Sequence, residues 1–159
     1  VHSIVHRSNM KSYEVASELR RLADEVETEE IEPLDFGGII EKLESLVRLG
    51  KEKAYITFDW GCAWPTGFDS YRGDYAQICM EFGGEHRHHE TVGGLLKKMQ
   101  DLLGTELTGW KGGDYTVDRS KDVYVCCAGC TSGTRVMDVT CDKSEYSSAK
   151  IRTATFVDD

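Results

Sequence analysis

Two short segments of this chain each combine a cation, an aromatic ring and a glycine. Residues 69–75 read DSYRGDY, and residues 108–116 read TGWKGGDYT. Arg72 and Lys111 each follow an aromatic residue, and the glycine that comes next lets the backbone approach a partner closely. Because the whole chain carries a formal net charge of -9, these cations stand out from an acidic background. The combination is typical of a binding site, but it specifies no reaction.

A third segment, residues 131–135 (TSGTR), adds two hydroxyl groups and a further cation. A nucleotide requires such a set of side chains, because cations hold its phosphates and an aromatic ring stacks on its base. The alternative is structural, with the aromatic rings in the core and Arg72 paired with Asp69 or Asp74. The sequence predicts a ligand site made of Tyr71, Arg72, Trp110, Lys111, Ser132, Thr134 and Arg135, in which Tyr71 and Trp110 stack on the base.

The motifs of common enzymes are absent from the sequence. It contains no GxSxG elbow, no Walker loop, no GxGxxG after a strand and no HExxH. The segment 109–113 has a lysine among glycines but lacks the Ser or Thr that follows lysine in a phosphate-binding loop. We therefore expect a protein that is not an enzyme and uses no cofactor. A hidden cysteine or carboxylate site is the enzymatic alternative.

Six cysteines, at positions 62, 79, 126, 127, 130 and 141, raise the question of metal binding. Zinc sites usually contain two ligand pairs at hairpin spacing, whereas this chain has one CxxC, formed by Cys127 and Cys130. The histidines of residues 86–89 could supply further ligands. We favour free thiols packed in the core and no metal site, with a redox pairing as another alternative.

Composition limits the remaining classes of function. The chain has 159 residues, of which 40% are hydrophobic and 30% charged, as in an ordinary globular protein. It contains no apolar run of about 20 residues and no signal-peptide pattern, which predicts a cytoplasmic protein without a membrane span. The acidic balance argues against nucleic-acid binding, because such binding requires a basic face.

The hydrophobic pattern predicts a single α+β domain over residues 10–159. Residues 1–9 precede Met10 and show no periodicity, so we expect them to be disordered or a non-native extension. The fold is predicted to be a mainly antiparallel sheet of about five strands with about three helices. The expected helices cover residues 12–30, 35–49 and 91–103, and the expected strands lie near residues 54–59, 76–82, 123–127, 135–141 and 149–157.

Residues 60–73 are rich in glycine, aromatic and turn residues, which predicts a long ordered loop. Its first part, residues 60–68, carries two tryptophans and a phenylalanine. Such a concentration of aromatic residues is typical of a subunit interface, although a loop packed over a sheet edge explains it equally well. We therefore expect a homo-oligomer.

The order of several of these motifs resembles that in a known group of proteins. Residues 55–59 (YITFD), 65–67 (PTG), 70–75 (SYRGDY), 109–116 (GWKGGDYT) and 132–134 (SGT) resemble small uncharacterised proteins of bacteriophages and prophages. The resemblance covers roughly residues 36–139. In outline the chain is also similar to phage anti-Thoeris sponges, oligomers that sequester a nucleotide immune signal without cleaving it. The resemblance implies a phage-encoded anti-defence protein that acts in the host cytoplasm.

A second hypothesis comes from the acidic residues between positions 14 and 32. Eight glutamates and aspartates in this stretch could imitate the charge of a nucleic acid. The protein would then be an acidic protein–protein interaction module that inhibits a host enzyme. A helix whose acidic face is simply solvated is the structural alternative.

Overall fold

A computed structural model describes residues 32–60, 63–74, 76–84, 89–126, 130–141 and 148–156. Contacts divide the chain into two compact units, Val1–Glu32 and Pro33–Asp159, and the description below concerns the second. The helix predicted over residues 12–30 and the extension predicted over residues 1–9 lie outside the described residues.

Helix α3 (Phe36–Arg48) begins where the sequence places a capping residue. The carboxylate of Asp35 accepts a hydrogen bond from the backbone N–H of Gly38 at 2.7 Å. Two further N–H groups of the first turn, those of Phe36 and Gly37, donate to carbonyl oxygens of the segment 119–121. The first N–H groups of a helix have no acceptor within the helix. Here two of them are paired with a segment that is distant in sequence. This pairing holds the start of α3 next to the segment 119–121.

Helix α4 (Val92–Leu102) is capped in the same way by Thr91, whose hydroxyl accepts from the N–H of Gly94 at 3.0 Å. Two residues after its last residue, Leu102, the chain reaches Gly104, which has a φ of +82° that favours glycine. The two described helices have 13 and 11 residues, and neither has the length and apolarity required to cross a membrane.

Six strands form one mixed sheet in the order β1-β8-β7-β6-β3-β2. Three neighbouring pairs are antiparallel, whereas β1 with β8 and β3 with β6 are parallel. The edge strands β1 and β2 also lie against each other, so the sheet is nearly closed into a barrel. The strands are β1 (Ile56–Phe58), β2 (Trp64–Ser70), β3 (Ile78–Gly83), β6 (Val123–Val125), β7 (Thr134–Cys141) and β8 (Ala149–Thr155).

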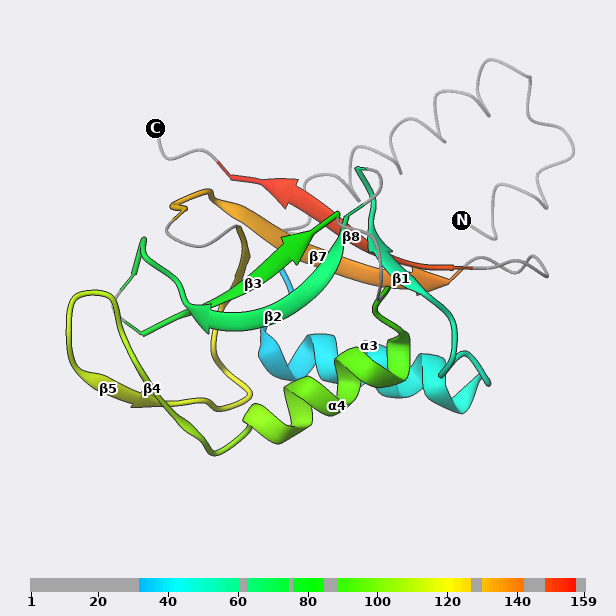
Figure 1. Cartoon of the computed structure of the whole chain (residues 1–159), viewed down its shortest axis with the longest axis horizontal. Helices are drawn as coiled ribbons and strands as arrows, with labels where there is room; N and C mark the ends of the chain where they lie inside the picture. The colour runs from blue at the N-terminus through cyan, green and yellow to red at the C-terminus, as the bar shows by residue number, and fades with distance from the viewer. Residues whose placement is uncertain are drawn as a thin grey trace, which may run out of the picture. The chain divides into compact units, whose positions relative to one another are not determined.

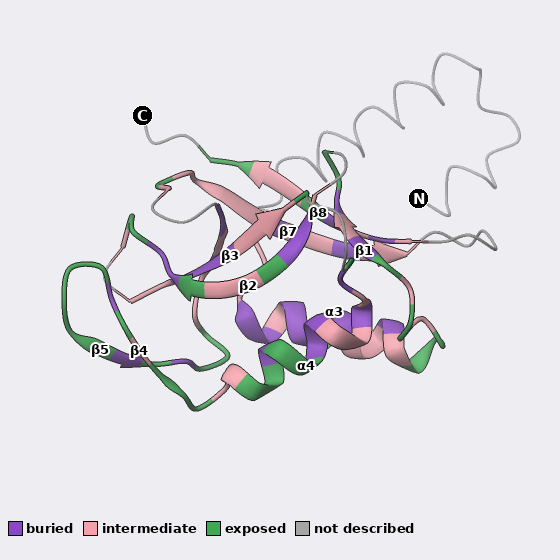
Figure 2. Cartoon of the chain, viewed as in Figure 1, coloured by how far each residue is buried: buried purple, intermediate pink, exposed green. Residues whose placement is uncertain are grey.

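Both described helices cover the same face of this sheet (Figure 1). Their apolar residues, spaced three and four apart, form the core together with one face of each strand. Figure 2 shows the buried residues concentrated where the helices meet the strands. The largest fully buried side chains are Phe36, Phe58, Ile39, Ile40, Leu43, Ile56, Ile78, Met80, Leu95, Met99, Ile151 and Val92.

The glycine-rich segment near residue 110 is the turn of a separate hairpin, formed by β4 (Glu106–Thr108) and β5 (Asp114–Thr116). Gly112 and Gly113 both have a φ of +85°, a conformation that side chains other than glycine rarely adopt. The two glycines of this motif are therefore required by the turn itself.

The predicted fold class was wrong. The described residues contain eight strands and two helices, and their main sheet is mixed rather than mainly antiparallel. Each of the five predicted strands has a counterpart, but β2, β4 and β5 were not predicted. Strand β2 occupies part of the predicted loop 60–73, and Pro65 and Gly67 mark a register shift within it. These two residues interrupt the alternation by which a strand is recognised in a sequence.

Replacing Asp35 with alanine should lower the free energy of unfolding by about 1 kcal/mol, because the cap of α3 is lost. Urea titration followed by circular dichroism measures this change. Asp35→Asn retains an oxygen acceptor, so its free energy of unfolding should fall much less. The control Asp101→Ala, at an exposed position of α4, should stay within about 0.5 kcal/mol of the parent chain. Equal stability of Asp35→Ala and the parent chain would contradict the capping role.

Candidate functional site

The two glycine-aromatic-basic segments lie next to each other in the folded chain. Ser70, buried at the end of β2, places its hydroxyl 2.7 Å from the carbonyl oxygen of Thr108 and 2.7 Å from the hydroxyl of Tyr115. In return, Nε1 of Trp110 donates to the carbonyl oxygen of Ser70 at 2.9 Å. These hydrogen bonds attach the β4–β5 hairpin to the end of β2.

Three of the predicted site residues, Arg72, Trp110 and Lys111, lie at this junction. The guanidinium of Arg72 lies over the ring of Trp110, 5.7 Å from its centroid. All three residues are exposed, and 53% of the Trp110 surface is accessible to solvent. Part of this cluster has a structural function, because the indole N–H of Trp110 anchors the hairpin.

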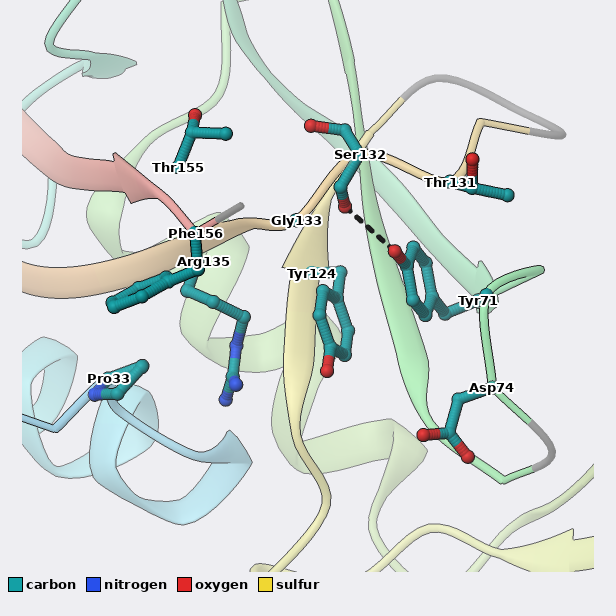
Figure 3. A pocket seen from close by; sticks show the side chains of 11 residues that line it. Pro33, Tyr71, Asp74, Tyr124, Thr131, Ser132, Gly133, Arg135, Thr155 and Phe156 are labelled. Carbon is teal, nitrogen blue, oxygen red and sulfur yellow. Dashed lines mark hydrogen bonds between the residues drawn. The ribbon is translucent and has the colours of Figure 1, made fainter. Parts of the chain in front are cut away.

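A second cluster is a stack of three side chains from three different parts of the sheet. The ring of Tyr71 lies parallel to that of Tyr124, with centroids 3.9 Å apart and an interplanar angle of 5°. The guanidinium of Arg135 lies 4.7 Å from the centroid of Tyr124. Tyr71 follows β2, Tyr124 belongs to β6 and Arg135 to β7. Figure 3 shows Tyr124 between the other two.

Arg135 is held by polar contacts on either side of its guanidinium. Its Nε donates to the carbonyl oxygen of Val123 at 2.9 Å, and its Nη2 donates to Asp122 at 3.2 Å. A guanidinium has five N–H groups, more than these two acceptors use. Arg135 can therefore support the stack and still donate to a ligand.

Tyr71 is fixed at the hydroxyl end of its ring. Its hydroxyl donates to the carbonyl oxygen of Ser132 at 2.9 Å, as the dashed line in Figure 3 shows. A Cβ atom on Gly73 would lie 2.5 Å from Cε2 of Tyr71 and 2.7 Å from its hydroxyl oxygen, so only glycine fits there. Tyr71 is 5% exposed, and one face of its ring is covered by Tyr124. It acts as a wall of the site rather than as an open stacking surface.

A chain of three hydroxyl groups runs beside the stack. The Thr134 hydroxyl lies 2.8 Å from that of Ser132 and 2.8 Å from that of Thr155. Three hydroxyls have three protons, of which the two internal hydrogen bonds use two. The chain can therefore present a donor at one end and an acceptor at the other, which lets it adapt to a bound group.

These parts enclose a cavity of about 640 Å³, called here the tyrosine cavity (Figure 3). Its volume is in the range of small-molecule sites. Tyr71, Ser132 and Arg135 of the predicted site line it, and Thr134 joins it through the hydroxyl chain. Arg72, Trp110 and Lys111 are not among its lining residues. The lining consists of Pro33, Tyr71, Gly73, Asp74, Tyr124, Thr131, Ser132, Gly133, Arg135, Thr155 and Phe156.

Sequence analysis did not identify Tyr124, Asp74 and Phe156 as members of the site. A signal existed for Tyr124, because the inward-facing Val123 and Val125 place it on the opposite face of β6. In the sequence, Asp74 is singled out only as a partner for Arg72. Phe156 follows β8, and nothing in its local sequence relates it to residues 131–135.

The structure describes four of the six cysteines, all of them free thiols. Cys79 and Cys126 are buried, with 3% and 2% of their surfaces exposed. A hydrogen bond with Cys79, together with burial, raises the pKa of the Cys126 thiol. Among the described residues, no three His, Cys, Asp or Glu side chains are arranged to hold a metal ion. Residues 86–88 and 127, which the metal hypothesis also used, lie outside the described ranges.

Comparison of the chain with protein families, with curated proteins and with solved structures gives no match. The function is therefore inferred from the geometry of the site.

The stability of the fold should fall as pH rises from about 10 to 12. Burial raises the pKa of Tyr71 from 10.0 to about 12, so the unfolded chain releases this proton at a lower pH than the folded chain does. Folding is then disfavoured within that window. Tyr71→Phe loses the hydrogen bond to Ser132, about 1 kcal/mol at pH 8, and also loses this proton. The stability difference between this variant and the parent chain should therefore shrink as pH rises above 10, and it should change sign before pH 12.

Urea midpoints measured at intervals from pH 8 to 12 test this expectation. Tyr55→Phe, at a position where 58% of the surface is exposed, serves as the control and should run parallel to the parent chain. Parallel curves for Tyr71→Phe and the parent would contradict the burial of an un-ionised Tyr71.

Proposed function

We propose that this protein is a non-enzymatic, phage-encoded binding protein that sequesters a phosphate-bearing nucleotide. The observation that carries the proposal is the tyrosine cavity, in which a cation, several hydroxyls, a carboxylate and an aromatic ring converge. Each of these groups has a counterpart in a nucleotide.

The phosphate end of the ligand would lie at residues 131–135. Arg135 supplies a charged donor, and Thr131 and Ser132 supply hydroxyls to the lining of the same cavity. Hydrogen bonds from a cation to phosphate oxygens are among the strongest in proteins. The guanidinium has Asp122 as a neighbour at 3.2 Å, which favours a ligand with one or two phosphates over a triphosphate.

The nucleoside would extend from Phe156, which lies next to Arg135, toward Asp74 on the other side of the tyrosine pair (Figure 3). The side chain of Phe156 is 48% exposed and lines the cavity, so its ring is accessible to a base. Its backbone N–H donates to the carbonyl oxygen of Gly133 at 3.1 Å, which ties it to the phosphate-binding segment. Asp74 is the carboxylate of the lining, and a carboxylate readily accepts hydrogen bonds from the hydroxyls of a ribose.

Binding without turnover is supported by the same set of side chains. The described lining residues include no histidine, cysteine or lysine, and Asp74 has no second carboxylate beside it among them. Nucleophilic and general acid–base catalysis require a nucleophile or base within hydrogen-bond reach of a partner group. The role in defence, the location in the host cytoplasm and the assembly into a homo-oligomer belong to the same proposal and come from the resemblance to phage proteins.

Isothermal titration of the full chain with ADP and with adenosine tests the proposal. ADP should bind, and adenosine should bind at least about tenfold more weakly, because it lacks the phosphates held by a charged donor. ADP recovered after incubation should be chemically unchanged. Absence of ADP binding, equal affinity for adenosine or conversion of ADP would contradict the proposal.

Two aromatic variants locate the site. Phe156→Ala should weaken ADP binding by about tenfold, as expected when base stacking on an aromatic ring is lost. Trp110→Ala removes an aromatic residue of similar exposure that does not line the cavity, and it should leave the affinity unchanged. Circular dichroism verifies that both variants fold. If Trp110→Ala weakens binding and Phe156→Ala does not, the site lies at the hairpin instead.

A further inference from the structure

Three thiols form a compact group beside the tyrosine stack. The sulfur of Cys79 lies 2.7 Å from the sulfur of Cys126, only about 0.7 Å more than the ~2.05 Å of a disulfide bond. Cys126 also has a side-chain hydrogen bond with Cys130. The three cysteines pack in one cluster with Tyr71 and Tyr124. We call Cys79, Cys126 and Cys130 the thiol trio.

The trio has access to solvent through a second cavity of about 490 Å³. Cys126 and Cys130 line this cavity, whereas Cys79 lies behind Cys126. Cys130 is partly exposed, and the backbone N–H of Ser132 donates to its sulfur at 3.3 Å, which positions that sulfur at the cavity wall. A small solute that enters the cavity therefore meets Cys130 or Cys126 before it meets Cys79.

Cys126 is the less reactive of the two thiols that line the cavity. The hydrogen bond with Cys79 and the burial of its sulfur hold Cys126 in the thiol form, and the charge of Glu81 acts in the same direction. Cys130 is the more accessible sulfur. This difference sets an order, in which Cys130 reacts with the incoming solute and Cys126 reacts with Cys130.

We propose that the thiol trio is a redox-modification site at which a small hydroperoxide drives formation of a Cys79–Cys126 disulfide. The Cys130 sulfur attacks the hydroperoxide, the O–O bond breaks, and a sulfenic acid and an alcohol (water, from hydrogen peroxide) form. The Cys126 sulfur displaces water from that sulfenic acid, which yields a Cys126–Cys130 disulfide. Cys79 then attacks the sulfur of Cys126 and releases the Cys130 thiol. The net reaction consumes two thiols and one hydroperoxide and produces one disulfide, one alcohol and one water.

The inference is independent of the proposed ligand, because it rests on the three sulfurs and on the second cavity. The parallel pairing of β3 with β6 brings the sulfurs together, since Cys79 lies opposite Tyr124 and Cys126 follows two residues later. The side chains of residues 124 and 126 therefore share a face of the strand. A covalent bond at this point would join the two strands directly below the tyrosine stack.

Hydrogen peroxide is the probe for the experiment, which uses the full chain. After exposure, the protein is denatured, its remaining thiols are alkylated with N-ethylmaleimide, and the mass of the intact chain is measured. The reduced chain has six cysteines and should take up six labels, and the oxidised chain should take up four. Peptide mapping should locate the disulfide between Cys79 and Cys126.

Serine variants separate the roles of the three sulfurs. Cys130→Ser should slow disulfide formation by about tenfold or more, because the accessible thiol is lost. In Cys79→Ser the reaction should stop at a Cys126–Cys130 disulfide. That disulfide is the intermediate from which the Cys79–Cys126 bond forms in the parent chain. Cys141→Ser, outside the trio, should form the same Cys79–Cys126 bond at the same rate. Six labels after peroxide treatment, a disulfide outside the trio or an unchanged rate in Cys130→Ser would overturn the proposal.

Discussion

The contact on which the site depends is the parallel stack of Tyr71, Tyr124 and Arg135. It joins the end of β2 to β6 and β7, which follow β2 by more than fifty residues. Stacked rings contribute about 0.5–1.5 kcal/mol beyond the apolar surface that they bury, and a cation over a ring adds a similar amount. Removal of the Tyr71 side chain would leave the carbonyl oxygen of Ser132 without the hydroxyl that donates to it. It would also remove the ring that packs against Gly73. The shape of the tyrosine cavity therefore follows from this stack.

The charges around the stack limit what the cavity can hold. Arg135 lies 3.2 Å from Asp122, and Asp74 lines the opposite part of the wall. In a protein of formal charge -9, an anion is attracted by local contacts and not by the field of the whole molecule. A ligand that combines an anionic group with hydroxyls and a ring suits this arrangement better than a simple anion does. The hydroxyl chain from Ser132 to Thr155 adds an adaptable surface beside the cation.

Local signals in the sequence predicted the described helices and part of the sheet, while long-range pairing escaped prediction. Asp35 and Thr91 cap their helices as their residue types indicate, and alternation revealed β1 and β3. The parallel pairing of β1 with β8 joins residues more than ninety positions apart, and no local pattern specifies it. In the site too, local motifs are visible in the sequence, whereas long-range contacts are not. The sequence draws attention to residues 69–75 and 108–116, but the turn itself explains the glycines of the second segment. Tyr124 enters the site only through the pairing of β3 with β6.

The central claim is that the tyrosine cavity holds a phosphate-bearing nucleotide, and native mass spectrometry tests it most directly. The full chain would be purified gently from bacterial cells with active defence systems and transferred intact into the gas phase. We expect one additional mass per chain that corresponds to a nucleotide and whose signal is weaker in Phe156→Ala. The number of chains in the particle would be measured in the same spectrum. A bare chain mass from these cells, unchanged after addition of ADP, would contradict the account.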